Sequence, residues 1–92
     1  MVRRRFEIPA GERRVVIDRR SGSIPRGYVL SIVAADGGAV TGSVEVQGSR
    51  WLFRRDPVTQ PIGPEIHVHK GFWDTLFRVA VTPDSDAIVV VT

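Results

Sequence analysis

The sequence contains no cysteine, and among its 13 basic residues Lys70 is the only lysine. Without thiols, the chain can form neither a disulfide nor a thiolate metal site. A chain of 92 residues buries only about 60 to 65% of the surface of its unfolded state. We therefore expect its stability to depend on tight packing or on contact with partner subunits.

Long apolar runs are also absent. No stretch approaches the ~20 residues that a membrane-spanning helix needs. The opening Met-Val-Arg-Arg-Arg-Phe resembles the charged start of a signal peptide, but Glu7, Pro9, Gly11 and Glu12 follow where an apolar run is required. We expect a soluble chain that is made in the cytoplasm, with no signal peptide and no transmembrane segment.

Alternation of apolar and polar residues recurs along the chain and is typical of half-buried β-strands. No segment shows sustained helical periodicity. We expect one all-β domain over residues 1–92, a jelly-roll-like β-sandwich or a small barrel, with an immunoglobulin-like sandwich as the alternative. The pattern predicts about eight short antiparallel strands: 4–8, 13–18, 28–35, 39–47, 50–54, two within 65–81, and 87–91.

Glycine and proline mark the connections between these strands. Asp36-Gly-Gly favours a tight hairpin, which predicts that the third and fourth strands pair with each other. Gly48-Ser predicts another tight turn, and Gly42 a bulge or a weak point in its strand. Residues 19–27 predict a loop. Residues 56–64 predict an ordered surface loop or a crossover between sheets, because their prolines prevent regular pairing.

The stretch 65–81 carries both histidines of the chain. Strict alternation places Ile66 and Val68 toward the core, and His67 and His69 on the opposite face. Two imidazoles at positions i and i+2 of a strand lie about 6 to 7 Å apart, which is close enough to share a metal ion. Large aromatic groups follow, and a domain this small normally needs them inside: Phe72, Trp73 and Phe77.

A metal site at the two histidines would need further ligands. Glu65 lies on the same face by parity, and Asp74 follows the corner. The interpretation that we favour is that His67 and His69 face solvent or an interface and bind no cofactor. One alternative is a metal ion shared between copies at a symmetry axis. The other is a cupin-like metal-binding protein, since the pair is similar to the His-x-His of that β-barrel family, although no Glu stands four to six residues after His69.

Positive charge is concentrated near the start of the chain. Residues 1–26 contain eight arginines and three carboxylates, a local charge of +5, which leaves −2 for the rest of a chain whose formal charge is +3. A basic edge suits acidic partner surfaces, nucleic acid or head-to-tail contact with another copy, and the alternative is a solvated edge that charge protects from aggregation. The predicted contact residues are Arg3, Arg4, Arg5, Arg19, Arg20 and Arg26.

Enzyme motifs are not recognisable in the sequence. There is no cysteine nucleophile, and Asp36-Gly-Gly lacks the lysine and the helix of a phosphate-binding loop. We therefore expect no catalytic activity and no small-molecule substrate.

A binding module for nucleic acid or carbohydrate is the alternative function. In residues 50–55, Trp51 and Phe53 alternate with arginines, an arrangement that can stack bases and neutralise phosphates. Because the two aromatics share one face, the alternation favours a core strand with a charged outer face instead. The carbohydrate alternative uses the same aromatics together with Tyr28.

Three segments of the sequence carry a resemblance to a known class of protein. They are the basic, apolar opening Arg-Arg-Phe-Glu-Ile-Pro-Ala-Gly at 4–11, the proline-rich passage into 63–72, and the valine-rich strands at 76–81 and 87–91. In this the chain resembles the small jelly-roll or β-sandwich structural proteins of bacteriophage particles, such as minor capsid, decoration and tail-associated subunits. The resemblance implies a non-enzymatic virion subunit that binds copies of itself and other virion proteins.

The strand at 87–91 is apolar on both faces. Such a strand either lies in the middle of its sheet or is covered by another chain.

Overall fold

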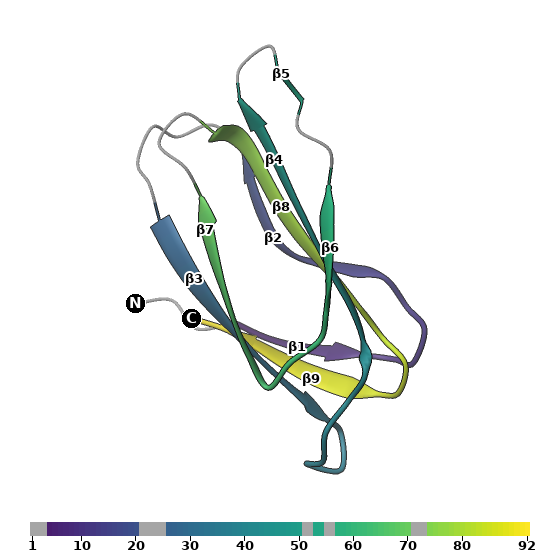
Figure 1. Ribbon diagram of the computed structural model, residues 1–92. Helices are drawn as coiled ribbons and strands as arrows, with labels where there is room; N and C mark the ends of the chain where they lie inside the picture. The colour runs from purple at the N-terminus through teal and green to yellow at the C-terminus, as the bar shows by residue number, and fades with distance from the viewer. Residues whose placement is uncertain (1–3, 21–25, 51–52, 55–56, 71–73) are drawn as a thin grey trace.

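The computed structural model describes residues 4–20, 26–50, 53–54, 57–70 and 74–92. These residues form strands, turns and short connections, and no helix occurs among them. The strands are β1 (Arg4–Ile8), β2 (Arg14–Arg20), β3 (Arg26–Ala34), β4 (Gly42–Arg50), β5 (Phe53–Arg54), β6 (Val58–Pro61), β7 (Glu65–Lys70), β8 (Asp74–Pro83) and β9 (Ala87–Val91) (Figure 1).

The strands pair from the two ends of the chain inward. β1 pairs antiparallel with β9, β2 with β8, β3 with β7 and β4 with β6. This long ribbon is rolled up, because β9 also pairs with β3 and β8 also pairs with β4. Two antiparallel sheets result. The first has the strand order β1-β9-β3-β7. The second has the order β2-β8-β4, and β5 and β6 pair one after the other with the outer edge of β4. With β5 and β6 counted as one interrupted strand, this is the eight-stranded arrangement of a jelly roll, and the predicted all-β class is confirmed.

The turn at Asp36 forms as predicted, but the predicted pairing of its two strands is wrong. Gly37 has a φ of +90°, and the Ala34 amide donates to the Gly38 carbonyl at 2.9 Å. However, β3 belongs to the first sheet and β4 to the second. Residues 35–41 are long enough to pass from one sheet to the other, and each strand buries its apolar face better between partners from distant parts of the chain.

Three further predictions about connections are wrong. Gly48 and Ser49 form no turn, because they lie within β4 opposite Phe77 and Leu76. The passage after residue 56 crosses from the second sheet to β7 in the first, as one of its two alternatives predicts. The prediction that it cannot pair regularly is wrong, because it contains β6, an edge strand that ends at Pro61. The predicted loop 19–27 is shorter at both ends, because its flanking residues belong to β2 and β3. In the same way the predicted strand 50–54 reduces to the last residue of β4 and the two residues of β5.

The core lies between the two sheets and follows the predicted alternation. In β3, the residues Tyr28, Leu30, Ile32 and Ala34 are all buried. Phe72 and Trp73 lie outside the described residues, whereas Phe77 is buried at 2% exposure. The side chains with no exposed surface at all are Leu30, Val44, Val79, Val81 and Val89.

The last strand is central in its sheet. β9 lies between β1 and β3, with Ala87, Val89 and Val91 buried on its inner face. Ile88 and Val90, on the outer face, are half-buried. Its apolar character on both faces is therefore explained by its central position, the first of the two alternatives.

Candidate functional site

The two histidines lie on β7, an edge strand of the first sheet. Burial alternates along β7 as predicted, so that His67 and His69 are exposed. The Nε2 atom of His67 lies 3.2 Å from Oε1 of Glu65. Asp74 begins β8 in the other sheet. Within the described residues, no group of three or more His, Asp or Glu side chains is arranged to hold a metal ion.

The structure spreads the predicted contact arginines over three strands. Arg4 and Arg5 belong to β1, and Arg5 forms an exposed ion pair with Glu7 at 3.2 Å. Arg19 and Arg20 end β2, and Arg26 begins β3. Arg3 lies outside the described residues. The five predicted arginines that the structure describes therefore lie on three strands and not along one continuous edge.

Basic residues gather instead at one end of the sandwich, the upper end in Figure 1. The register brings their positions together, because Arg26 pairs with Lys70, and Arg20 and Ser49 both pair with Leu76. Asp74 begins β8 at this end. We call this the basic end, defined by the positions of Arg19, Arg20, Arg26, Arg50 and Arg54. Lys70 also lies at this end, but its side chain is buried at 3% exposure.

Carboxylates gather at the opposite end, where the turns after β1, β3 and β8 meet. The Gly11 amide donates to the Pro83 carbonyl at 2.7 Å, and the Ala35 amide donates to the Asp86 carbonyl at 2.8 Å. We call this the acidic end, defined by Glu12, Asp36, Asp84 and Asp86. The molecule measures 41 Å along its longest axis, so the two ends are well separated.

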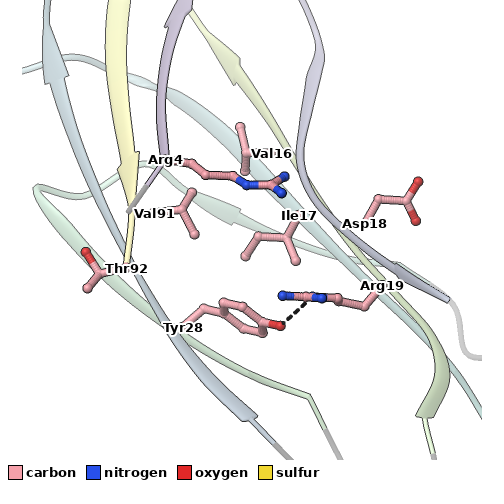
Figure 2. Close-up of a pocket in the computed structure, with 8 residues that line it drawn as sticks. All are labelled: Arg4, Val16, Ile17, Asp18, Arg19, Tyr28, Val91 and Thr92. Atoms are coloured by element: carbon pink, nitrogen blue, oxygen red, sulfur yellow. Dashed lines mark hydrogen bonds between the residues drawn. The ribbon is translucent and has the colours of Figure 1, made fainter. Parts of the chain in front are cut away.

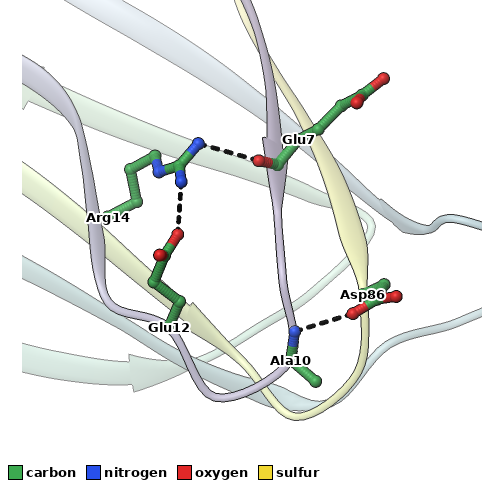
Figure 3. Close-up of polar contacts among 5 residues, drawn as sticks. All are labelled: Glu7, Ala10, Glu12, Arg14 and Asp86. Carbon is green, nitrogen blue, oxygen red and sulfur yellow. Dashed lines mark hydrogen bonds and ion pairs between the residues drawn. The ribbon is translucent and has the colours of Figure 1, made fainter.

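Two arginines also lie near the acidic end, but both are paired there. Arg13 Nη2 lies 3.3 Å from Glu45 Oε1. Arg14 pairs with Glu12, and its Nη1 donates to the backbone oxygen of Glu7 at 2.9 Å (Figure 3). These pairs neutralise the two arginines locally and leave the aspartates of the acidic end as its dominant charges.

The three aspartates of the acidic end each accept a hydrogen bond within the chain. Oδ1 of Asp36 accepts from the Gly38 amide at 2.9 Å, and Oδ2 of Asp84 accepts from Thr41 Oγ1 at 2.8 Å. Oδ1 of Asp86 accepts from the Ala10 amide at 2.9 Å (Figure 3). The aspartates therefore hold the turns in place while their exposed charges face outward.

A bulge in β2 determines where Arg19 points. The register with β8 shifts between Val15 and Ile17, and the extra residue leaves both Val16 and Ile17 buried. A bulge of this kind moves the following side chains to the opposite face. Asp18 consequently lies opposite Arg78, on the outer face, and Arg19 lies opposite the buried Phe77.

Arg19 reaches a cavity of about 130 Å³ between the edges of the two sheets (Figure 2). Its Nε donates to the hydroxyl oxygen of Tyr28 at 3.1 Å. The Tyr28 ring stacks on Phe77, with centroids 5.9 Å apart and an angle of 15° between the planes. Arg4 extends into the same space from β1. The remaining lining residues are Val16, Ile17, Asp18, Val91 and Thr92.

The sequence predicts Arg4 and Arg19 as contact residues, but it does not predict that the two lie close together or that Tyr28 lies beside them. The consecutive apolar residues Val15, Val16 and Ile17 were the available signal, because a regular half-buried strand alternates and this one does not. The predicted nucleic-acid surface at 50–55 remains a prediction, since Trp51 and Arg55 lie outside the described residues.

No protein-family model, no curated protein and no solved structure matches this chain. In the part of the chain that the structure describes, no helix has the length and apolar character needed to cross a membrane.

Proposed function

We propose that this chain is a non-enzymatic structural subunit of a virus particle of the bacteriophage type, which assembles head to tail with copies of itself and with other virion proteins. The observation that carries the proposal is the separation of charge between the basic end and the acidic end of one small sandwich. Two distinct, complementary surfaces on one molecule form a heterologous contact, and repeated contacts of this kind build rings or filaments.

The strand order supports the virus-particle setting. Jelly rolls recur in viral capsid proteins, in lectin domains and in cupins. A cupin-type site needs more ligands than the exposed His67 and His69, and the described residues place no such group around them.

Charge reversal at each end tests the proposal. The variant Arg20→Glu/Arg26→Glu lowers the formal charge of the five arginines of the basic end from +5 to +1. The variant Asp36→Lys/Asp84→Lys raises the formal charge of the acidic end from −4 to 0. We expect the wild-type chain to self-associate at low salt, each variant alone to remain monomeric, and an equimolar mixture of the two variants to associate again. Light scattering over a range of concentrations measures the mass in each case.

The control is Arg5→Glu, compared with the single variant Arg20→Glu of equal net charge. Arg5 is the second residue of β1 and forms an exposed ion pair with Glu7, so its reversal should leave association within about twofold of wild type. A wild-type mass of 10.2 kDa at every concentration would contradict self-assembly. Salt-sensitive binding of single-stranded DNA by this monomer, lost in Arg20→Glu/Arg26→Glu, would favour the nucleic-acid alternative instead.

A further inference from the structure

Two guanidinium groups share the cavity between the sheet edges without a carboxylate between them. Arg4 enters from β1 and Arg19 from β2 (Figure 2). Among the described residues, neither forms an ion pair. The acidic lining residue, Asp18, directs its carboxylate away from the space between the two arginines, toward Arg78 at 3.8 Å (Figure 2). Two like charges facing one cavity favour the entry of an anion.

Arg19 is held in place for such a role. Its Nε is bound to Tyr28, which is itself fixed by stacking on the buried Phe77. A guanidinium carries five N–H donors in a rigid plane, so four donors on the two Nη atoms remain for other partners. A donor group that is already ordered loses less conformational entropy when it binds a carboxylate.

The size and lining of the cavity limit what can enter. A volume of about 130 Å³ corresponds to roughly four water molecules at about 30 Å³ each, which is room for one carboxylate or phosphate group. Val16, Ile17 and Val91 supply apolar surface beside the two cations. A carboxylate on a methylene group matches both features, because the methylene packs on the apolar lining while the oxygens meet the arginines.

The acidic end offers a carboxylate of this kind. Asp84, Ser85 and Asp86 form an exposed turn between β8 and β9. Each aspartate uses one carboxylate oxygen for its hydrogen bond within the chain, to Thr41 or to Ala10. The turn is exposed at this end of the sandwich, where hydrogen bonds to the turns after β1 and β3 hold it in place.

We propose that the cavity between Arg4 and Arg19 is an oxyanion-binding site that receives an aspartate carboxylate from the β8–β9 turn of a neighbouring copy. This assignment rests on the head-to-tail assembly proposed above and names one of its contacts. The same cavity chemistry also suits free acetate or phosphate, so the test distinguishes the neighbouring chain from a free anion.

The test compares Arg4→Gln and Arg19→Gln with the matched control Arg5→Gln, which removes the same charge outside the cavity. Two readouts are used on the full chain: self-association by light scattering, and the thermal shift produced by sodium acetate or sodium phosphate relative to sodium chloride at equal ionic strength. We expect both cavity variants to lose the anion-specific shift and to weaken association at least tenfold, with Arg5→Gln within twofold of wild type in both. The donor variant Asp84→Asn/Asp86→Asn keeps acceptors for Thr41 and Ala10, and it should lose association while its anion shift remains.

Other outcomes overturn the proposal in distinguishable ways. If both cavity variants associate normally, the carboxylate of a neighbouring copy does not occupy the cavity, whether or not anions shift the thermal unfolding of the wild type. The proposed head-to-tail assembly would then still stand. An anion shift in a wild-type chain that never associates would reject the proposed assembly and assign the cavity to a free anion. If Arg19→Gln unfolds at a lower urea concentration, Arg4→Gln decides the question, because no hydrogen bond within the described residues depends on Arg4.

Discussion

Arg19 reaches the space between the sheets because of the bulge at residues 15–17. In a regular strand it would have pointed outward, and Asp18 would have faced the core instead. The bulge exchanges the two, placing a cation beside Tyr28 and a carboxylate beside Arg78 on the outer face. One inserted residue thus decides whether this part of the molecule attracts or repels an anion.

Gly42 is a second position where one residue decides the local structure. It has a φ of +147°, and a Cβ built there would lie 2.3 Å from the backbone oxygen of Thr82. Gly42, which the sequence predicts as a bulge or weak point, therefore lies where the start of β4 and the end of β8 approach each other closely.

We expect Gly42→Ala to lower the free energy of unfolding by about 2 to 4 kcal/mol, because both the backbone conformation and the contact are incompatible with a side chain. The control is Gly63→Ala, where no atom lies within 4 Å of the added Cβ. That change should be neutral or stabilising by about 0.4 to 1 kcal/mol. Urea unfolding measures both, and equal midpoints for the two variants would show that Gly42 is not constrained.

At the level of elements, the strands differ in how firmly their sheets hold them. β8 lies between β2 and β4, and β9 between β1 and β3. β6 has β4 on one side alone, and its Val58 is 65% exposed. The described structure therefore contains strands whose backbone groups are paired on both sides, and edge strands paired on one side.

Amide hydrogen exchange should follow this difference. We expect peptides from β8 and β9 to exchange slowest, at the rate set by global unfolding, and peptides from β6 to exchange at least about tenfold faster through local opening. Mass spectrometry at neutral pH resolves the segments. Equal protection of β6 and β8 would mean that β6 is covered, for example in an assembled state, and repeating the measurement at low protein concentration separates these cases.

At the level of the whole molecule, the nested pairing of strands explains the charged ends. Because the chain is one ribbon rolled into two sheets, turns that are distant in sequence meet at each end. Glu12, Asp36 and Asp84 come from three separate turns and share the acidic end, while Arg20 and Arg26 come from two strands and share the basic end. No local segment contains either cluster.

Salt should therefore weaken assembly. Exposed charges are screened beyond about 10 Å at 0.1 M salt and beyond about 3 Å at 1 M, so we expect the dissociation constant for self-association to rise at least tenfold between 0.05 M and 0.5 M NaCl. Sedimentation velocity measures it, and stability of the monomer to urea should change far less. Association that strengthens with salt would indicate an apolar interface instead.

A chelator tests the remaining metal alternative, in which copies of the chain share a metal ion. If His67 and His69 shared a metal ion with another copy at a symmetry axis, chelation would dissociate the assembly at constant salt. We expect the mass to be unchanged.

Local sequence patterns were enough to predict which residues form most strands and which side chains face the core. Alternation is a local property with a period of two residues, so β1, β3, β7 and β9 could be predicted from their own residues. The pairing of the strands could not be predicted in this way, because it depends on how whole apolar faces are buried together in the folded molecule. Asp36-Gly-Gly therefore predicted a turn correctly but not the separation of β3 from β4. The candidate site depended on the tertiary structure for the same reason: the bulge in β2 exists only in relation to the register of β8, and it alone brings Arg19 to Arg4.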